Sequence, residues 1–374
     1  MAKCKCGQTF SSDKSLTQHQ NAKAENGTSC EKQAARRPRR QDATSNKWLR
    51  EDAMDVKPFH VIRSNSITIS SVPVAITNFE VVCTYNWLES DSSNASIPGY
   101  APYWKPPCLP FQVQKDIVAA KKRDKNPSAP EYPFEIVFRA AEEMNPQLSF
   151  NDVDVVINRN SLRKLLDFCG GQVMESFKLN LLLVKDTLFI ERDEALRKPA
   201  HIPHPLPKQA MDITVFFVIQ LATCAHIDIA ARIGDASEPA AHDDTENRVM
   251  PQTTAAEIKS TQTPKSPNKY LAQLWFGRTP WLLTGRHTGG RFDSVDVFDA
   301  SSRFCQWETA NQEKLRKLAT VLEQLRCAVK ANSGRNCIAV CEKAAGPKMI
   351  EILASKMTGD ALPIEIIDRF WSVD

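Results

Sequence analysis

Glutamate and lysine stand two residues apart in the segment 253–260, which reads Thr-Thr-Ala-Ala-Glu-Ile-Lys-Ser. Small and β-branched residues predict a β-strand here, and residues i and i+2 of a strand point to the same face. We therefore expect Glu257 and Lys259 to project together, with Ile258 turned into the core. A carboxylate that holds a divalent cation, beside a lysine that orients water or neutralises charge, suits metal-assisted phosphodiester hydrolysis. A surface ion pair on an unrelated α/β domain is the alternative interpretation of the same residues.

Two other segments carry polar residues in positions that suit a site. His226 and Asp228 are again two residues apart in a segment of strand character, so both are expected on one face. Arg159 lies where an apolar strand runs into a helix, and a neighbouring asparagine or serine can cap that helix. An arginine at such a junction can bind phosphate bidentately or pair with a structural carboxylate, and the residues alone leave both interpretations open.

The first thirty residues contain three cysteines and one histidine with spacing typical of zinc ligands. The interval between Cys6 and His19 matches the twelve-residue gap of a zinc finger, and Cys4 and Cys30 complete a Cys-Cys-His-Cys set. The short first gap and the long last gap depart from the usual C2H2 spacing, so a disordered cysteine-bearing tail is the alternative. One finger reads about three base pairs, which favours auxiliary nucleic-acid contact or protein docking.

Length and composition limit the class of protein. The chain has 374 residues, of which 42% are hydrophobic and 25% charged, and its net charge is +4. Affinity for nucleic acid must therefore come from a local patch. Eleven scattered cysteines and the lack of a secretory signal predict a reduced, intracellular protein of the nucleus, the cytoplasm or both. The longest apolar run, from Ile213 to Ala222, is too short to span a membrane.

The order of predicted elements gives an α+β or α/β fold, a mixed β-sheet flanked by helices. Strands are expected at 67–69, 79–87, 153–158, 177–184, 187–191, 211–231, 281–285, 295–298 and 338–341, and helices at 134–144, 159–168, 268–276 and 304–330. Leucines at 3/4 spacing in the last helix predict a core face. The expected domains are a zinc-finger-like module (1–30), a basic disordered linker (31–57), a core (58–345, with a disordered insertion at about 195–252) and a C-terminal tail (346–374).

This arrangement resembles the decapping exoribonuclease (DXO) family of RNA 5′-end quality-control nucleases, which have a PD-(D/E)xK-like core. The resemblance covers most of residues 58–345 and is most specific from Glu257 to Arg291. The family's motifs follow in the same order: an arginine at a strand-to-helix junction, a hairpin, a Glu-x-Asp strand, a Glu-x-Lys strand, a helix with a glutamine, and a strand ending in a Gly-Phe-Arg-like turn. The matching segments here are 155–159, 177–191, 226–228, 257–259, Gln273 and 282–286.

The resemblance implies a divalent-metal centre for Mg²⁺ or Mn²⁺. Its ligands would be Asp228, Glu257, the carbonyl oxygen of Ile258 and His226, which stands where the family has a glutamate. The family's Gly-x-x-x-Glu motif has no counterpart before this strand, where residues 197–210 are rich in proline and histidine. Loss of two acidic groups weakens binding of hard cations, although imidazole can still ligate manganese or a transition metal. A misread exon boundary in this part of the gene would explain the same departure.

The resemblance also implies a substrate and partners. Lys259 would act with the two carboxylates in catalysis, and Arg159, Gln273 and Arg286 would position the substrate. The implied activity is hydrolysis at the RNA 5′ end: decapping, removal of pyrophosphate or 5′–3′ exoribonuclease action. The implied partners are RNA 5′ ends and a 5′–3′ exoribonuclease protein, and we expect a monomer. A catalytically impaired relative that binds nucleic acid or protein is the alternative.

Overall fold

The computed structural model falls into two compact units, Met1–Glu51 and Asp52–Asp374. It describes residues 2–3, 9–12, 19, 43–76, 79–87, 95–99, 104, 106–113, 132–192, 216–221, 227–229, 251–344 and 346–371. In the first unit, strand β1 (Ala2–Lys3) pairs antiparallel with β2 (Thr9–Phe10), and a 3-10 helix, η1, spans Ala43–Arg50. Cys4, Cys6 and Cys30 lie outside the described residues, so the zinc site predicted with His19 stays a prediction.

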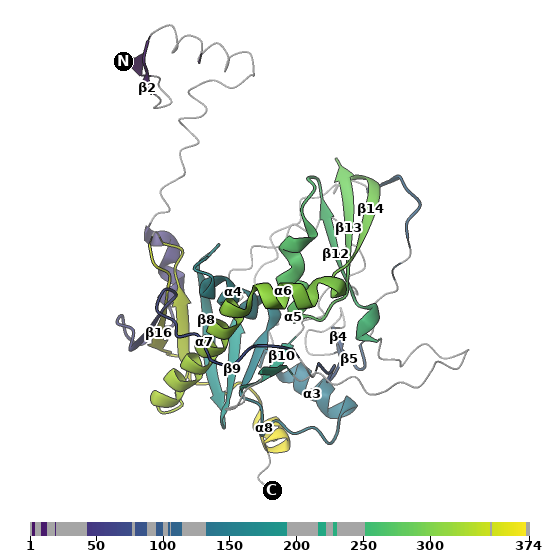
Figure 1. Ribbon diagram of the computed structural model, residues 1–374. Helices are drawn as coiled ribbons and strands as arrows, with labels where there is room; N and C mark the ends of the chain where they lie inside the picture. Colours follow the sequence, from purple (N-terminus) through teal and green to yellow (C-terminus); the bar gives the residue numbers. More distant parts are fainter. Residues whose placement is uncertain are drawn as a thin grey trace, which may run out of the picture. The chain divides into compact units, whose positions relative to one another are not determined.

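An eight-stranded mixed sheet forms the base of the second unit (Figure 1). Its order is β11-β10-β7-β9-β8-β15-β16-β3, and all neighbours are antiparallel except β7 and β9. Strands β8 and β9 form the predicted hairpin, which turns at Lys185. The strands are β3 (His60–Arg63), β7 (Val155–Asn158), β8 (Phe177–Val184), β9 (Thr187–Arg192), β10 (Phe216–Leu221), β11 (Ile227–Ile229), β15 (Cys337–Cys341) and β16 (Met349–Ala354).

Helices cover both faces of this sheet. One core packs the sheet against α4 (Arg159–Cys169) and α7 (Gln312–Ala331), and the other packs it against α3 (Glu135–Met144) and α8 (Ile364–Phe370). In Figure 1, α7 lies across β8 and β9. Neighbouring residues of β8 are therefore buried on opposite faces, which explains why nearly the whole strand is buried, Lys178 and Asn180 included. The predicted leucine stripe of α7 is confirmed, because its leucines are buried in the first core.

A second, four-stranded sheet has the order β12-β13-β14-β6. Strand β12 runs parallel to β13, whereas β14 is antiparallel to both β13 and β6. Among the described residues, none of the helices is long and apolar enough to cross a membrane. The remaining elements are β4 (Asn86–Trp87), β5 (Ala95–Ser96), β6 (Phe111–Gln112), η4 (Gln252–Thr254), β12 (Ala256–Thr261), η5 (Pro267–Tyr270), α5 (Leu271–Phe276), β13 (Trp281–Thr288), β14 (Arg291–Asp299), η6 (Ser301–Arg303) and α6 (Phe304–Ala310).

The orientation of Ile258 differs from the prediction. Its side chain is 63% exposed, so the prediction that it turns into the core is wrong. Glu257 lies opposite Leu282 of β13, and Leu282 is buried in a small core with Leu271 and Leu274 of α5. The face of the sheet that carries Glu257 therefore packs against α5, and Ile258 on the edge strand faces the other way. The carboxylate and the ammonium thus occupy the more buried face.

Several predicted boundaries also differ. The predicted C-terminal tail is wrong, because β16 pairs with β15 and β3 and α8 buries three apolar residues. The predicted linker contains η1, and Ala53 forms a β-bridge with Ser355. Residues 67–69 and 79–85 are not strands, and the last predicted helix is broken at Asn311 into α6 and α7. The apolar runs at 67–69 and 79–85 are too short to show a clear period, so the sequence determines their type and limits poorly.

Buried thiols make stability depend on alkaline pH. Burial raises the pKa of Cys169 and of Cys341 to about 12. A thiol in the unfolded chain ionises near 8.5. Above that pH the unfolded state loses protons that the folded state keeps, so the free energy of unfolding falls as pH rises towards the folded pKa.

We expect Cys169→Ala to make this alkaline loss of stability shallower by about 1.4 kcal/mol per pH unit. Urea unfolding of the wild type and the variant at pH 8 to 11 measures the slope. Leu165→Ala removes a buried apolar side chain of the same helix and no titratable group, so it should keep the wild-type slope. Equal slopes for Cys169→Ala and the wild type would contradict the expectation.

Candidate active site

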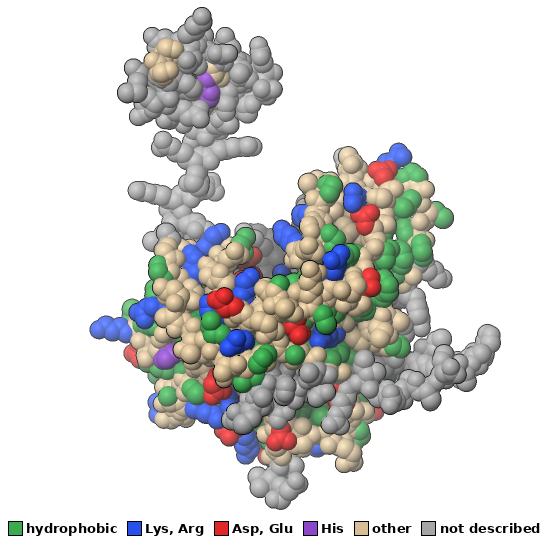
Figure 2. Space-filling model, viewed as in Figure 1, with side chains coloured by type: hydrophobic (Ala, Val, Ile, Leu, Met, Phe, Trp, Pro, Cys, Tyr) green, Lys and Arg blue, Asp and Glu red, His purple; other side chains and the backbone are tan. Residues whose placement is uncertain are grey.

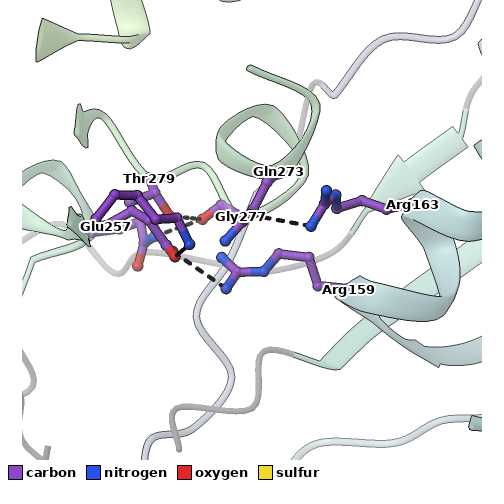
Figure 3. Close-up of polar contacts among 8 residues, drawn as sticks. Arg159, Arg163, Glu257, Gln273, Gly277 and Thr279 are labelled. Atoms are coloured by element: carbon purple, nitrogen blue, oxygen red, sulfur yellow. Dashed lines mark hydrogen bonds and ion pairs between the residues drawn. The ribbon is translucent and has the colours of Figure 1, made fainter. Parts of the chain in front are cut away.

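Three charged side chains meet between helix α4 and strand β12 (Figure 3). Arg159 Nη2 lies 3.4 Å from Glu257 Oε2, and Lys259 Nζ lies 2.5 Å from Glu257 Oε1. Glu257 and Lys259 project together from β12, as the sequence predicts. The three side chains are partly buried: Arg159 is 19% exposed, Glu257 18% and Lys259 29%. Ion pairs shielded to this degree are screened less by salt than surface pairs.

The junction of β7 and α4 fixes the position of Arg159. Asn158 is extended and its side chain accepts a hydrogen bond from the backbone N–H of Ser161 at 2.8 Å, which caps α4. Arg159 is thus the first helical residue. Burial lowers the pKa of its guanidinium, Glu257 opposes this effect, and the charge of Arg163 adds to it. Arginine stays charged in spite of such shifts.

Helix α5 brings a buried glutamine to the same place. Gln273 is 7% exposed, and its Oε1 accepts a hydrogen bond from Arg163 Nη1 at 3.2 Å. Figure 3 shows Arg159 and Arg163 extending from α4 towards Gln273. Gln273 was predicted as a substrate-binding residue, but Arg163 was not predicted at all. Its position four residues after Arg159, on the same face of one helix, is the signal that could have found it.

The turn after α5 is held close to Arg159. Gln252 Nε2 donates to the carbonyl oxygens of Gly277 and Arg278, at 2.8 Å and 3.2 Å. A Cβ at Gly277 would lie 2.9 Å from Arg159 Nη1, so only glycine leaves room for the guanidinium. Arg278 has a left-handed backbone (φ 44°), and its guanidinium donates to the carbonyl oxygen of Ile76 at 2.7 Å. These contacts fix the turn from both sides.

Among the side chains that the structure describes, the charges in the site do not balance. Arg159, Arg163 and Lys259 carry three positive charges, and Glu257 is the carboxylate that contacts two of them. On the face shown in Figure 2, basic and acidic side chains are interspersed. The positive excess is therefore a local feature, as the low net charge of the chain requires. A partly buried site with this excess favours an anionic ligand such as phosphate.

The described residues supply only part of the predicted metal centre. Glu257 provides hard oxygen donors of the kind that Mg²⁺ and Mn²⁺ prefer, next to the carbonyl oxygen of Ile258 on the same strand. Within the described part of the chain, no three His, Cys, Asp or Glu side chains form a group that could hold a metal ion. Asp228 lies on edge strand β11, but its side chain and the whole of His226 lie outside the described residues. The metal centre therefore stays a prediction.

Arg286 lies on β13 but contacts a different partner. Its guanidinium pairs with Asp296 of β14 at 2.6 Å, and both side chains are about half exposed. This pair spans neighbouring strands. The cluster around Glu257, which consists of Arg159, Arg163, Glu257, Lys259 and Gln273, joins β12 and α5 to α4. The predicted role of Arg286 in substrate binding stays a prediction.

A family model described as "Domain of unknown function (DUF8563)" matches residues 57–200 and 221–371. The chain belongs to this family. The DUF8563 match includes every side chain of the cluster around Glu257 and leaves out the N-terminal unit. A comparison with curated proteins gave no match.

The solved structures that are similar to this DUF8563 chain include two Rai1 complexes. Rai1 of S. pombe, in complex with 3′-FADP, is 12% identical, with a TM-score of 0.50 over 79% of this chain and 99% of that chain. Rai1 of Candida albicans, in complex with pU5 and Mn²⁺, is 10% identical, with a TM-score of 0.53 over 83% of this chain and 98% of that chain. At such low identity the likeness shows the fold alone. It confirms the predicted fold class, a mixed α+β core flanked by helices.

Proposed function

We propose that this protein is a metal-dependent hydrolase of RNA 5′ ends, acting by decapping, removal of pyrophosphate or 5′–3′ exoribonuclease cleavage. The observation that carries the proposal is the cluster in which Arg159 and Lys259 both contact Glu257, beside Gln273. A carboxylate for a cation and two cationic groups for phosphate are the parts that phosphodiester hydrolysis needs. The Rai1 structure with pU5 and Mn²⁺ supports this class of ligand for the fold.

The side chains of the cluster have donors for both a phosphate and Glu257. A guanidinium has five N–H donors and an ammonium has three. Arg159 and Lys259 can therefore donate to the oxygens of a 5′ phosphate without leaving Glu257, while the carboxylate still competes with the phosphate for their charge. Gln273 would orient the same group through its amide, and Lys259 would position the attacking water or neutralise charge on the transferred phosphoryl group. Arg286 would contact the RNA further along the sheet.

A divalent cation completes the proposed site. Glu257, Asp228 and the carbonyl oxygen of Ile258, with His226, would hold Mg²⁺ or Mn²⁺. When bound, the ion supplies Lewis-acid stabilisation of phosphate charge and a more acidic water. The fit rests on the oxygen donors of Glu257 and β12, since the other two side chains are placed by sequence alone.

The proposal predicts hydrolysis that requires a divalent metal. The full chain is mixed with RNA bearing a 5′ triphosphate, an unmethylated cap or a 5′ monophosphate, each with Mg²⁺, Mn²⁺ or EDTA. We expect metal-dependent product from at least one RNA, which names the preferred end, and none from Glu257→Ala at equal folded concentration. A folded wild-type protein that leaves all three RNAs intact would refute the hydrolase.

One observation favours a second function, metal-independent binding of RNA 5′ ends by a catalytically impaired relative. The described part of the site has one carboxylate among three cationic side chains, a set that suits an anion better than a metal ion. In that case the chain binds 5′-phosphorylated RNA with strong salt dependence and gives no product with either metal.

Further parts of the function are proposed from the sequence. We propose that the N-terminal unit binds zinc through Cys4, Cys6, His19 and Cys30 and contacts nucleic acid or protein. A 5′–3′ exoribonuclease protein is the proposed partner of the core, which would act as a monomer in the nucleus, the cytoplasm or both.

A further inference from the structure

The two arginines on one face of α4 have different kinds of partner. Arg163 follows Arg159 by one helical turn, and side chains at i and i+4 are neighbours on the helix surface. Arg159 contacts the carboxylate of Glu257, whereas Arg163 donates to the neutral amide oxygen of Gln273. Within the described residues, Arg163 forms no ion pair shorter than 4.0 Å. Among the described side chains, the second guanidinium is therefore held in the site without a carboxylate in ion-pair contact.

A structural role alone does not explain a charge at this position. A neutral donor would satisfy the amide of Gln273 equally well, whereas a second guanidinium repels Arg159, whose pKa it helps to lower. Burial raises the pKa of Asp167, one turn further along α4. Arg163 opposes this rise most among the nearby charges, followed by Lys314 and Lys164, so one carboxylate is shared by three cations. The charge of Arg163 thus adds to the positive excess around Glu257 and suits a second anionic group.

We propose that Arg163 binds a second phosphate group of the same RNA 5′ end whose first phosphate is bound by Arg159, an inference that rests on the proposed function. Arg163 uses one Nη1–H on Gln273, and the rest of its planar fork can donate to phosphate oxygens. Gln273 holds the guanidinium in place before the RNA arrives, which reduces the entropy lost on binding. The second phosphate belongs to a 5′ oligophosphate or to the phosphodiester between the first two nucleotides.

The test measures affinity without divalent metal, so that no ligand is hydrolysed. Dissociation constants of the full chain are measured in EDTA for a nucleoside 5′-monophosphate, a nucleoside 5′-triphosphate and a 5′-phosphorylated dinucleotide. We expect Arg163→Gln to weaken binding of at least one ligand with a second phosphate by about tenfold or more. Binding of the monophosphate should change less than about twofold. Arg163→Lys keeps the positive charge but lacks the planar guanidinium. Its affinity for these ligands should lie between those of the wild type and Arg163→Gln.

Lys164→Gln is the matched control. It removes the same charge from the adjacent residue of the same helix, but Lys164 faces Glu175 and lies over the ring of Phe177. It should leave the preference among the three ligands unchanged. Circular dichroism and thermal unfolding of each variant establish that the fold is retained.

Each outcome decides the inference. Loss confined to the triphosphate assigns Arg163 to an oligophosphate, and loss confined to the dinucleotide assigns it to the phosphodiester. Equal loss for all three ligands, no loss, or no binding by the wild type would overturn the proposal. Hydrolysis by the wild type with unchanged affinities in Arg163→Gln refutes only this inference. If Arg163→Gln selectively loses affinity and the wild type hydrolyses none of the RNAs, only the proposed hydrolase activity is refuted.

Discussion

Replacing Glu257 by glutamine is expected to abolish hydrolysis and, at the same time, to tighten metal-free binding of 5′-phosphorylated RNA. The carboxylate contacts Arg159 at 3.4 Å and Lys259 at 2.5 Å. It therefore serves the proposed cation and also competes with phosphate for both basic groups. An amide of the same size removes the charge that holds the cation and leaves the two basic groups to the RNA.

The two effects of Glu257→Gln have different sizes. Losing a metal ligand removes several kcal/mol of transition-state stabilisation, and 4 kcal/mol corresponds to about a thousandfold in rate. A hydrogen bond to a charged group contributes about 1.5–3 kcal/mol, so the freed cations should improve affinity at least about tenfold. Single-turnover hydrolysis with Mn²⁺ and fluorescence anisotropy in EDTA measure the two quantities on one RNA.

Because hydrolysis should fall while RNA affinity rises, the expected result of Glu257→Gln differs from that of a general loss of folding. A misfolded variant would lose both hydrolysis and binding. Glu313→Gln is the control, because Glu313 pairs with Lys317 on the surface of α7, and it should change neither quantity. If Glu257→Gln binds RNA more weakly than the wild type in EDTA, then Glu257 does not compete with phosphate and the proposed arrangement is incorrect.

The sequence predicts those parts of the site that depend on local pattern. Period-2 alternation puts Glu257 and Lys259 on one face, and the change from strand to capped helix puts Arg159 at a junction. The hairpin β8–β9, the strand-to-helix unit β7–α4 and the apolar face of α7 are also local patterns, and the structure contains all three. Each follows from residues within a few positions of one another.

Local pattern does not show which segments meet. The hydrogen bond from Arg163 to Gln273 joins residues 110 positions apart, and no property of either segment indicates the other. The direction of Ile258 depends on whether α5 covers one face of β12 or the other, which is also a tertiary fact. Gln252, which fixes the turn after α5, precedes β12 in a short polar segment without periodicity. Packing between distant segments determines all three.

The second large effect is expected from Gly277→Ala. The backbone at Gly277 has φ −78° and ψ −1°, which alanine adopts without strain, so the added methyl group acts by contact alone. It would lie 2.9 Å from Arg159 Nη1 and 2.9 Å from Thr279 Oγ1. A Cβ so close displaces the guanidinium and the Thr279 hydroxyl, both of which are end groups of side chains. Arg159 would then lose its position beside Glu257 at little cost in stability.

Removal of one positioned donor for a reacting phosphate typically slows catalysis about a hundredfold or more. We therefore expect Gly277→Ala to lower kcat/KM for RNA about a hundredfold, with a midpoint of thermal unfolding within about 3 °C of the wild type. Steady-state hydrolysis with Mn²⁺ measures kcat/KM, and thermal unfolding measures the midpoint. Unchanged kcat/KM in the folded variant would mean that Arg159 is not held against the turn.

Gly285→Ala makes the same chemical change in a different environment. Its Cβ would lie 2.8 Å from the ring of Phe292, which stacks on Phe111 at 4.8 Å between ring centroids. A stacked ring moves away less easily than a guanidinium, so this variant should lose stability first. If Gly277→Ala loses activity and Gly285→Ala loses stability, then Gly277 is required because Arg159 lies against it. Equal loss of stability in both would instead assign Gly277 to the packing of the turn.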